Sequence, residues 1–263
     1  MISQSTSNLK ISDFSTGYRK KQIIDNLTLP KFEAGNLIAI AGPNAAGKST
    51  FLKALAGHLS ATGTVMLDDK NLFDLKFEEW AERVTFMPQK LPDGVGLTVL
   101  ESVISALKTI PSPKFLNKQK IHEQAMEILE QVGIEGIAMQ PLNKISGGQR
   151  QLASLAQSLV RDPDLFLLDE PTSALDLRYQ TQVMNLLGQL AQKGKIVFVV
   201  LHNLSLAARW ADQIIIFRDG KLHAFGPPKE AITSEVLAHV YGVKARIEQC
   251  SCHQLQIMVD SVI

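Results

Sequence analysis

Three short runs of mainly apolar residues place the strongest limit on how this chain can fold. They are Asn36–Ala41, Leu165–Leu168 and Ile196–Leu201, and they do not alternate apolar with polar side chains. Strands buried on both faces have this pattern, which is typical of parallel sheets covered by helices. Between the second and third runs, Arg178–Gln192 carries apolar residues at helical spacing. The sequence therefore predicts a β-α-β unit within an α/β fold.

Other segments predict smaller additions to this core. Leu9–Phe14 and Gly63–Leu67 alternate apolar with polar residues, as antiparallel strands with one wet face do. Helical patterns cover Thr98–Leu107 and Lys118–Val132, and Pro111 and Pro113 break the chain between them. We therefore expect one chain-long unit over 1–263. Its parts are a core with an antiparallel β subdomain at about 1–90 and 150–250, a helical insertion at about 91–148, and a C-terminal tail at about 248–263.

Composition excludes several classes of protein. The 263 residues are 45% apolar and 20% charged, which is ordinary for a globular chain of one large domain or two small ones. The net charge of +1 argues against a protein that coats nucleic acid, so we expect no nucleic-acid partner. No targeting segment is visible at the N-terminus, and no apolar run approaches the roughly 20 residues of a membrane span. Any membrane association is expected to go through a partner.

Cysteine usage leaves two interpretations open. Cys250 and Cys252 are the two cysteines of the chain, and His253 follows them. The cluster could bind a metal ion or could be an exposed, reduced tail. We favour the tail, because zinc sites typically use a second pair of ligands that is absent here.

The run that follows Asn36–Ala41 fits the phosphate-loop pattern G-x-x-x-x-G-K-[ST] and opens a predicted helix at Thr50–Leu59. Backbone N–H groups of such a loop converge on phosphate oxygens, while Lys48 supplies charge to the β- and γ-phosphates and Ser49 offers a hydroxyl to Mg²⁺. The expected nucleotide-binding residues of the loop are Gly42, Pro43, Asn44, Ala45, Ala46, Gly47, Lys48, Ser49 and Thr50.

Two acids end the second apolar run. Asp169 and Glu170 directly follow Leu165–Leu168, and the carboxyl end of a sheet strand is where α/β folds bind ligands. We expect Asp169 to help hold Mg²⁺ and Glu170 to act as general base toward the attacking water. A guanine-reading Asn-Lys-x-Asp motif is missing, because Lys120 and Ser146 stand where its aspartate would be.

Lys144–Gln151 lies upstream of this acidic strand end, and it resembles the signature motif of ABC ATPases. Phosphate loop, signature and acidic strand in this order are highly specific to that family. The resemblance implies ATP and Mg²⁺ as cofactors and a head-to-tail homodimer. In such a dimer the signature of one chain closes over the nucleotide held by the other, at the N-terminus of a helix predicted for Gln149–Leu159. The signature residues expected at that nucleotide are Ser146, Gly147, Gly148 and Gln149.

Further positions match the family residue by residue. The resemblance implies that Tyr18 stacks on adenine, that Gln89 contacts Mg²⁺ and the region of the attacking water, and that His202 contacts the γ-phosphate. It also implies that Ser173–Asp176 crosses the dimer interface. Ala45 departs from the pattern, since many members have glycine there, and alanine is penalised if the position needs a positive φ. Ile145 replaces the usual leucine.

The C-terminal third resembles importer ATPases more than other branches. Leu201–Gln213, Asp219–Lys221, Gly226–Pro228 and Tyr241–Val243 look like the corresponding segments of bacterial importers of iron-siderophores, haem or cobalamin. This implies a separate membrane permease, a substrate-binding protein, and a place at the cytoplasmic face of the membrane. The helical insertion would present a groove to a short permease helix. An efflux ATPase and a soluble ABC ATPase acting on nucleic acid or ribosomes stay open as alternatives.

Overall fold

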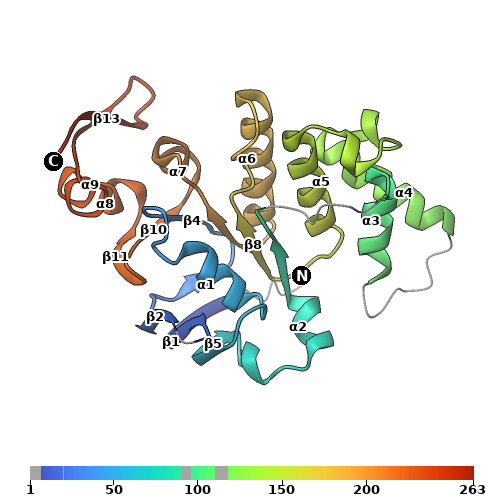
Figure 1. Cartoon of the computed structure of the whole chain (residues 1–263), viewed down its shortest axis with the longest axis horizontal. Helices are drawn as coiled ribbons and strands as arrows, with labels where there is room; N and C mark the ends of the chain where they lie inside the picture. Colours follow the sequence, from blue (N-terminus) through green and yellow to red (C-terminus); the bar gives the residue numbers. More distant parts are fainter. Residues whose placement is uncertain (1–6, 20, 90–95, 110–117) are drawn as a thin grey trace, which may run out of the picture.

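The computed structural model describes residues 7–19, 21–89, 96–109 and 118–263. Its centre is a six-stranded sheet with the order β11-β10-β4-β9-β8-β7 (Figure 1). Five of these strands run parallel, and β11 pairs antiparallel with β10 at one edge. This confirms the predicted α/β class. The strands are β4 (Leu37–Ala41), β7 (Val84–Met87), β8 (Leu165–Asp169), β9 (Ile196–Val200), β10 (Gln213–Arg218) and β11 (Lys221–Gly226).

A second, antiparallel sheet packs beside the first, as the alternating segments predict. Its order is β2-β1-β5-β6, with β3 also paired to β1. β1 runs past Phe14, where the predicted strand ends, and pairs with β2, which lies in a segment without a predicted strand. The members are β1 (Asn8–Tyr18), β2 (Lys21–Leu27), β3 (Phe32–Glu33), β5 (Ala61–Leu67) and β6 (Lys70–Asn71).

The central strands are apolar throughout because each of them serves two cores. In β4, Leu37, Ala39 and Ala41 belong to one buried cluster, and Ile38 and Ile40 belong to another. Successive side chains of a strand point to opposite faces, so both faces of this strand are covered. The second cluster lies toward the antiparallel sheet and contains aromatic rings in edge-to-face contact, such as Phe51 with Phe14 and Phe217.

Helices pack on the central sheet, and three of them form a group at one end of the molecule. Figure 1 shows α3, α4 and α5 grouped at one end of the molecule, and these three helices contact one another. The α4 bounds equal those predicted, whereas Pro111 and Pro113 lie outside the described residues. The helices are α1 (Lys48–Leu55), α2 (Phe77–Arg83), α3 (Val99–Lys108), α4 (Lys118–Val132), α5 (Gly147–Leu159), α6 (Leu177–Gln192), α7 (Leu204–Trp210), α8 (Pro228–Ala231) and α9 (Ser234–Tyr241). Short 3-10 turns are η1 (Leu72–Asp74), η2 (Glu135–Ile137) and η3 (Leu142–Lys144).

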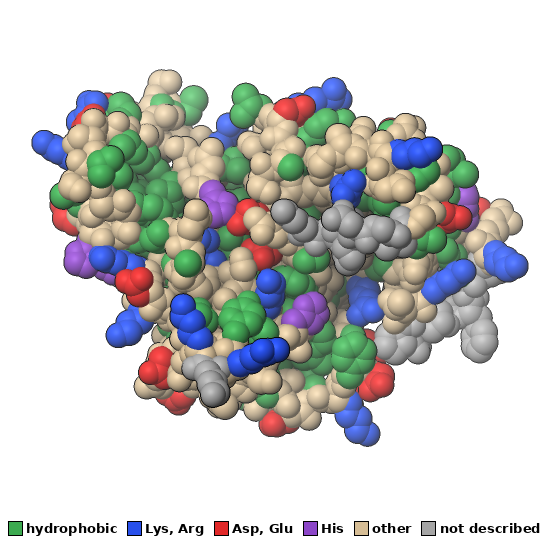
Figure 2. Space-filling view, in the orientation of Figure 1, with side chains coloured by type: hydrophobic (Ala, Val, Ile, Leu, Met, Phe, Trp, Pro, Cys, Tyr) green, Lys and Arg blue, Asp and Glu red, His purple; other side chains and the backbone are tan. Residues whose placement is uncertain are grey.

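The C-terminal segment is ordered differently from the expected tail. Most of residues 248–263 belongs to an antiparallel hairpin of β12 (Val243–Gln249) and β13 (Leu255–Val262), which packs on α9 and α7. Cys250 and Cys252 lie in its turn, and within the described residues no three metal-binding side chains converge. Figure 2 shows apolar side chains gathered over this end of the molecule. Among the described helices, none has the length and apolar character needed to span a membrane.

Candidate functional site

The loop after β4 adopts a backbone that its sequence only partly favours. Gly42 has φ +142°, and a Cβ there would lie 2.2 Å from Phe217 O, so only glycine fits. Gly47 has φ +100° and precedes α1. Ala45 has φ +62°, a left-handed conformation that costs a residue with a Cβ about 1–2 kcal/mol. Position 45 therefore does adopt the positive φ that glycine, the residue of many family members, would adopt without this cost.

Lys48 lies at the bottom of this loop and is only 6% exposed. Its Nζ donates to Gly42 O at 2.8 Å and to Pro43 O at 2.7 Å. Burial lowers the pKa of this amine, and the nearby carboxylates of Glu170 and Asp169 partly oppose that shift. A desolvated cation whose described hydrogen bonds both go to neutral carbonyls is suited to exchange them for phosphate oxygens, which form stronger, charge-assisted hydrogen bonds.

The first of the two acids at the end of β8 contacts the start of α1. Ser49 Oγ donates to Asp169 Oδ1 at 2.9 Å, and Asp169 is 1% exposed. Burial is the main reason why the pKa of Asp169 is raised; Glu170 adds to the rise, while the hydrogen bond from Ser49 and the charges of Lys53 and Lys48 oppose it. A hydroxyl beside a buried carboxylate is an oxygen donor pair that fits Mg²⁺.

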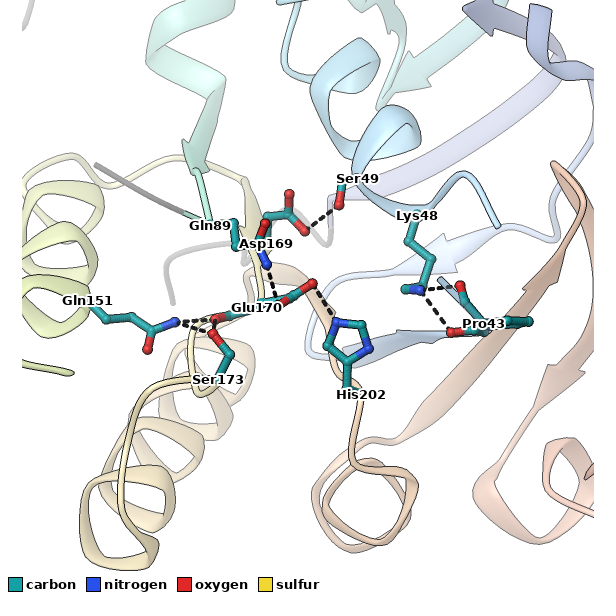
Figure 3. Close-up of polar contacts among 10 residues, drawn as sticks. Pro43, Lys48, Ser49, Gln89, Gln151, Asp169, Glu170, Ser173 and His202 are labelled. Carbon is teal, nitrogen blue, oxygen red and sulfur yellow. Dashed lines mark hydrogen bonds and ion pairs between the residues drawn. The ribbon is translucent and has the colours of Figure 1, made fainter. Parts of the chain in front are cut away.

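Glu170, the second acid, is held through both carboxylate oxygens (Figure 3). Gln89 Nε2 donates to Oε2 at 2.7 Å, and His202 Nε2 lies 2.5 Å from Oε1. The three side chains follow β7, β8 and β9, so the parallel sheet brings them together at the carboxyl ends of its strands. Glu170 also has φ +57°, a conformation that is uncommon for residues other than glycine.

A cavity of about 250 Å³ connects these groups. The phosphate loop from Asn44 to Thr50 lines it together with Glu170 and His202. Figure 2 shows oppositely charged side chains close together near the middle of this face. Tyr18 is 44% exposed and lines a separate hollow of about 790 Å³, which shares Lys21 with the first.

The signature residues stand apart from that cavity. Ser146 caps α5 by accepting from Gln149 N at 3.2 Å, and Gln149 Oε1 accepts from Ser146 N at 3.0 Å. Ser146 and Gly147 are exposed, Gly148 and Gln149 are half-buried, and none of them is among the described residues that line the cavity. The structure thus brings Gln89, Asp169, Glu170 and His202 to the phosphate loop, but it presents Ser146–Gln149 on the surface as a helix N-terminus.

Two residues of this region are not among the site residues predicted from the sequence. Gln151 is 7% exposed and hydrogen-bonds to the loop that follows Glu170. Tyr241, at the end of α9, is half-buried, and burial raises the pKa of its phenol to about 12, with the backbone of Gly42 partly opposing that rise. Both stand inside segments that carry the family resemblance, but nothing local in the sequence names their partners.

Known proteins match the chain along nearly its whole length. The family model described as "ABC transporter" matches residues 24–173. The ferric enterobactin transport ATP-binding protein FepC of Escherichia coli is 34% identical over 94% of this chain and 91% of its own length. The hemin import ATP-binding protein HmuV of Rhodococcus jostii is 36% identical over 84% of this chain and 75% of its own.

Solved structures agree with this assignment. One chain of an inward-facing, putative metal-chelate type ABC transporter matches with a TM-score of 0.79 and 24% identity. The match covers 98% of this chain and 98% of that chain, and it supports the fold. The ATP-binding cassette MJ0796, a dimer bound to ADP and phosphate after hydrolysis, gives a TM-score of 0.76 at 27% identity over 84% of this chain and 98% of its own. The family match and the relatives together show that the chain belongs to the ABC transporter family as an ATP-binding, ATP-hydrolysing member.

Proposed function

We propose that this chain powers the import of an iron-siderophore, haem or cobalamin type substrate through a separate membrane permease. The observation that carries the ATPase part is the arrangement of Gln89, Asp169, Glu170 and His202 around the phosphate loop. The substrate class is supported by relatives such as FepC, a ferric enterobactin transport protein, and HmuV, a hemin import protein. The chain itself would work at the cytoplasmic face of the membrane, and a substrate-binding protein would deliver the cargo on the opposite side.

The residues of the cavity divide the chemistry among them. Lys48 would leave its two carbonyl acceptors and bind the β- and γ-phosphates. Ser49, Asp169 and Gln89 would hold Mg²⁺, which neutralises phosphate charge when it is bound. Glu170 would accept the proton of the water that attacks the γ-phosphorus. His202 would donate from its ring to a γ-phosphate oxygen. Tyr18, beside the cavity, would stack on the adenine.

The signature requires a second copy of the chain. Ser146–Gln149 form an exposed, capped helix N-terminus, which is a suitable site for an anion. These residues do not face the chain's own phosphate loop, so a head-to-tail homodimer would place them on the partner's nucleotide. In that dimer Ser173–Asp176 would lie at the interface between the two chains.

A charge placed at Ser146 tests the shared site. We expect Ser146→Arg to keep nucleotide binding by the single chain but to abolish ATP-dependent dimerisation and hydrolysis. Thr98→Arg is the matched control, because Thr98 caps α3 with the same type of capping box and lies outside the signature. An active Ser146→Arg chain, or a Thr98→Arg chain equally unable to dimerise, would contradict the shared site.

A groove beside the helical insertion is suited to the permease. We propose that the helical insertion at about 91–148 moves when the nucleotide state changes. A hollow of about 290 Å³ lies between α2 and the pair α3 and α5 and is lined by Phe77, Trp80 and Arg161, among others. Arg161 donates to Ala81 O at 2.8 Å and to Thr109 Oγ1 at 3.0 Å. No acid is among the described lining residues, so a short apolar helix that carries a carboxylate would complement this groove.

Reversing the charge in the groove tests this docking. We expect Arg161→Glu to reduce copurification of the chain with its permease in detergent by about tenfold or more, because a carboxylate would then face a carboxylate. Arg209→Glu on α7 is the control, since Arg209 is exposed and stacks on Trp210 away from the groove. Equal retention of the two variants would contradict docking at Arg161.

A further inference from the structure

Gln151 connects two parts of the chain that serve different nucleotides in the proposed dimer. It lies in α5, the helix that begins with the signature glycines, and its side chain reaches the loop after β8 (Figure 3). Its Nε2 donates to the backbone carbonyl of Glu170 and, at 3.1 Å, to Ser173 Oγ. Its Oε1 accepts from Ala174 N at 2.9 Å. One buried amide therefore holds that loop at three residues, Glu170, Ser173 and Ala174.

The contact orients the backbone of Glu170. This residue holds φ +57°, and its carbonyl also accepts from Ser173 Oγ at 3.2 Å. Because the side chain direction follows from the backbone conformation, donors that hold the carbonyl also fix where the carboxylate points. That carboxylate is the group set between Gln89 and His202.

The first turn of α5 packs closely on the same loop. A Cβ on Gly148 would lie 2.8 Å from Ala174 O and 3.3 Å from Leu175 Cδ2. Such close packing leaves no free space between the signature and Ala174, so a displacement of one displaces the other. Gln151, one turn further along, carries the same displacement to Glu170 through hydrogen bonds.

We propose that Gln151 is a positioning residue that couples the two ATP sites of the homodimer. The signature of each chain would contact the partner's nucleotide, while Glu170 of that chain acts on its own nucleotide. When Ser146–Gly148 engage the partner's ATP, Gln151 sets Glu170 of its own chain for hydrolysis. The inference rests on the proposed homodimer, and it adds a route by which occupancy of one site controls chemistry at the other.

The chain offers a matched control in Gln180. Its Nε2 donates to Leu175 O at 3.0 Å and to Thr172 O at 3.3 Å, so it holds the same loop from α6. None of the described hydrogen bonds of its side chain reaches Glu170 or α5. Replacing each glutamine with methionine removes an amide of the same size, and general loosening of the loop would therefore affect both variants.

The test is a steady-state ATPase titration of parent, Gln151→Met and Gln180→Met, with ADP affinity measured alongside. For Gln151→Met we expect ADP affinity within about twofold of the parent and kcat reduced by roughly 10- to 100-fold, since small misplacement of a reacting group costs up to about 100-fold. We also expect the Hill coefficient to fall from above 1 in the parent to 1. Gln180→Met should keep the parent Hill coefficient.

Several results would overturn the coupling role. They are a parent Hill coefficient of 1, or a Gln151→Met chain that matches Gln180→Met in both kcat and cooperativity. Gln151→Asn keeps a buried amide that is one methylene shorter, and it replaces Gln151→Met if that chain does not bind ADP. A parent chain without ATPase activity would instead refute the proposed function, and this inference with it.

Discussion

Replacing Glu170 with glutamine tests the assignment of the general base with little change in shape. The two carboxylate oxygens accept from Gln89 Nε2 at 2.7 Å and lie 2.5 Å from His202 Nε2. An amide can keep both contacts: its oxygen accepts from Gln89, and its NH₂ donates to His202 in the tautomer protonated at Nδ1. We therefore expect the free energy of unfolding to change by less than about 1 kcal/mol, because no buried group loses its partner.

The chemical consequence is large by comparison. Loss of a general base lowers the rate by about 10²- to 10⁴-fold, which is about 3–5 kcal/mol of activation free energy. Binding should survive, since Lys48 and the phosphate loop are untouched. Purified Glu170→Gln should run as a dimer on gel filtration with ATP in the absence of Mg²⁺ and as a monomer with ADP. Phosphate release, measured with excess ATP and Mg²⁺, gives the rate.

A control separates the position from the chemistry of the exchange. Glu101→Gln makes the same substitution in the capping box of α3 and keeps an oxygen for Thr98 N. It should hydrolyse ATP at the parent rate. If Glu170→Gln releases phosphate within tenfold of the parent, Glu170 is not the base.

Three further substitutions test other parts of the site. Lys48→Ala should weaken ATP binding by the single chain at least about tenfold, because a charge-assisted hydrogen bond contributes about 1.5–3 kcal/mol. An unchanged dissociation constant in a fluorescent-nucleotide titration would contradict the role of Lys48. Ala45→Gly relieves about 1–2 kcal/mol of left-handed strain and loses about 0.5–1 kcal/mol to the greater entropy of the unfolded chain, so urea unfolding should show a gain of up to about 1.5 kcal/mol. A clear loss of stability would refute the strain. The pKa of Tyr241 is raised to about 12 by burial, so the protonated phenol favours the folded state, and this contribution is complete below pH 10 and lost as the pH rises through 12. Tyr241→Phe should therefore lose roughly 2–3 kcal/mol less than the parent between pH 10 and 12, and parallel stability curves would exclude this effect.

Local patterns in the sequence were sufficient for the core elements and for the phosphate loop. Residues 196–200 form the predicted strand and residues 118–132 the predicted helix. Both signals, an unbroken apolar run and apolar residues at helical spacing, depend only on residues that are close together in the sequence. Likewise, the loop glycines and Lys48 form a motif that requires no distant partner. The sheet order then brings the acidic end of β8 beside α1, as the fold class predicts.

Contacts between distant segments could not be predicted in the same way. Gln151 acts through a backbone carbonyl on another element, and the phenol of Tyr241 is buried by segments that are distant in the chain. A single sequence does not indicate which distant segments meet at either side chain. The hairpin of β12 and β13 is a different case. Residues 243–248 alternate between apolar and polar, so a strand signal is present there, but the prediction of a tail from about 248 does not include the second strand of the hairpin.

The paired contacts of Glu170 have a consequence for how its two neighbours can be substituted. Both oxygens of this carboxylate are engaged, one by Gln89 and one by His202. Each oxygen still has a further lone pair, so these contacts fix the direction of the carboxylate without removing its capacity to accept a proton. Gln89 and His202 therefore act together as a clamp on the side chain, and a substitution of either one would leave the acid chemically intact but free to rotate.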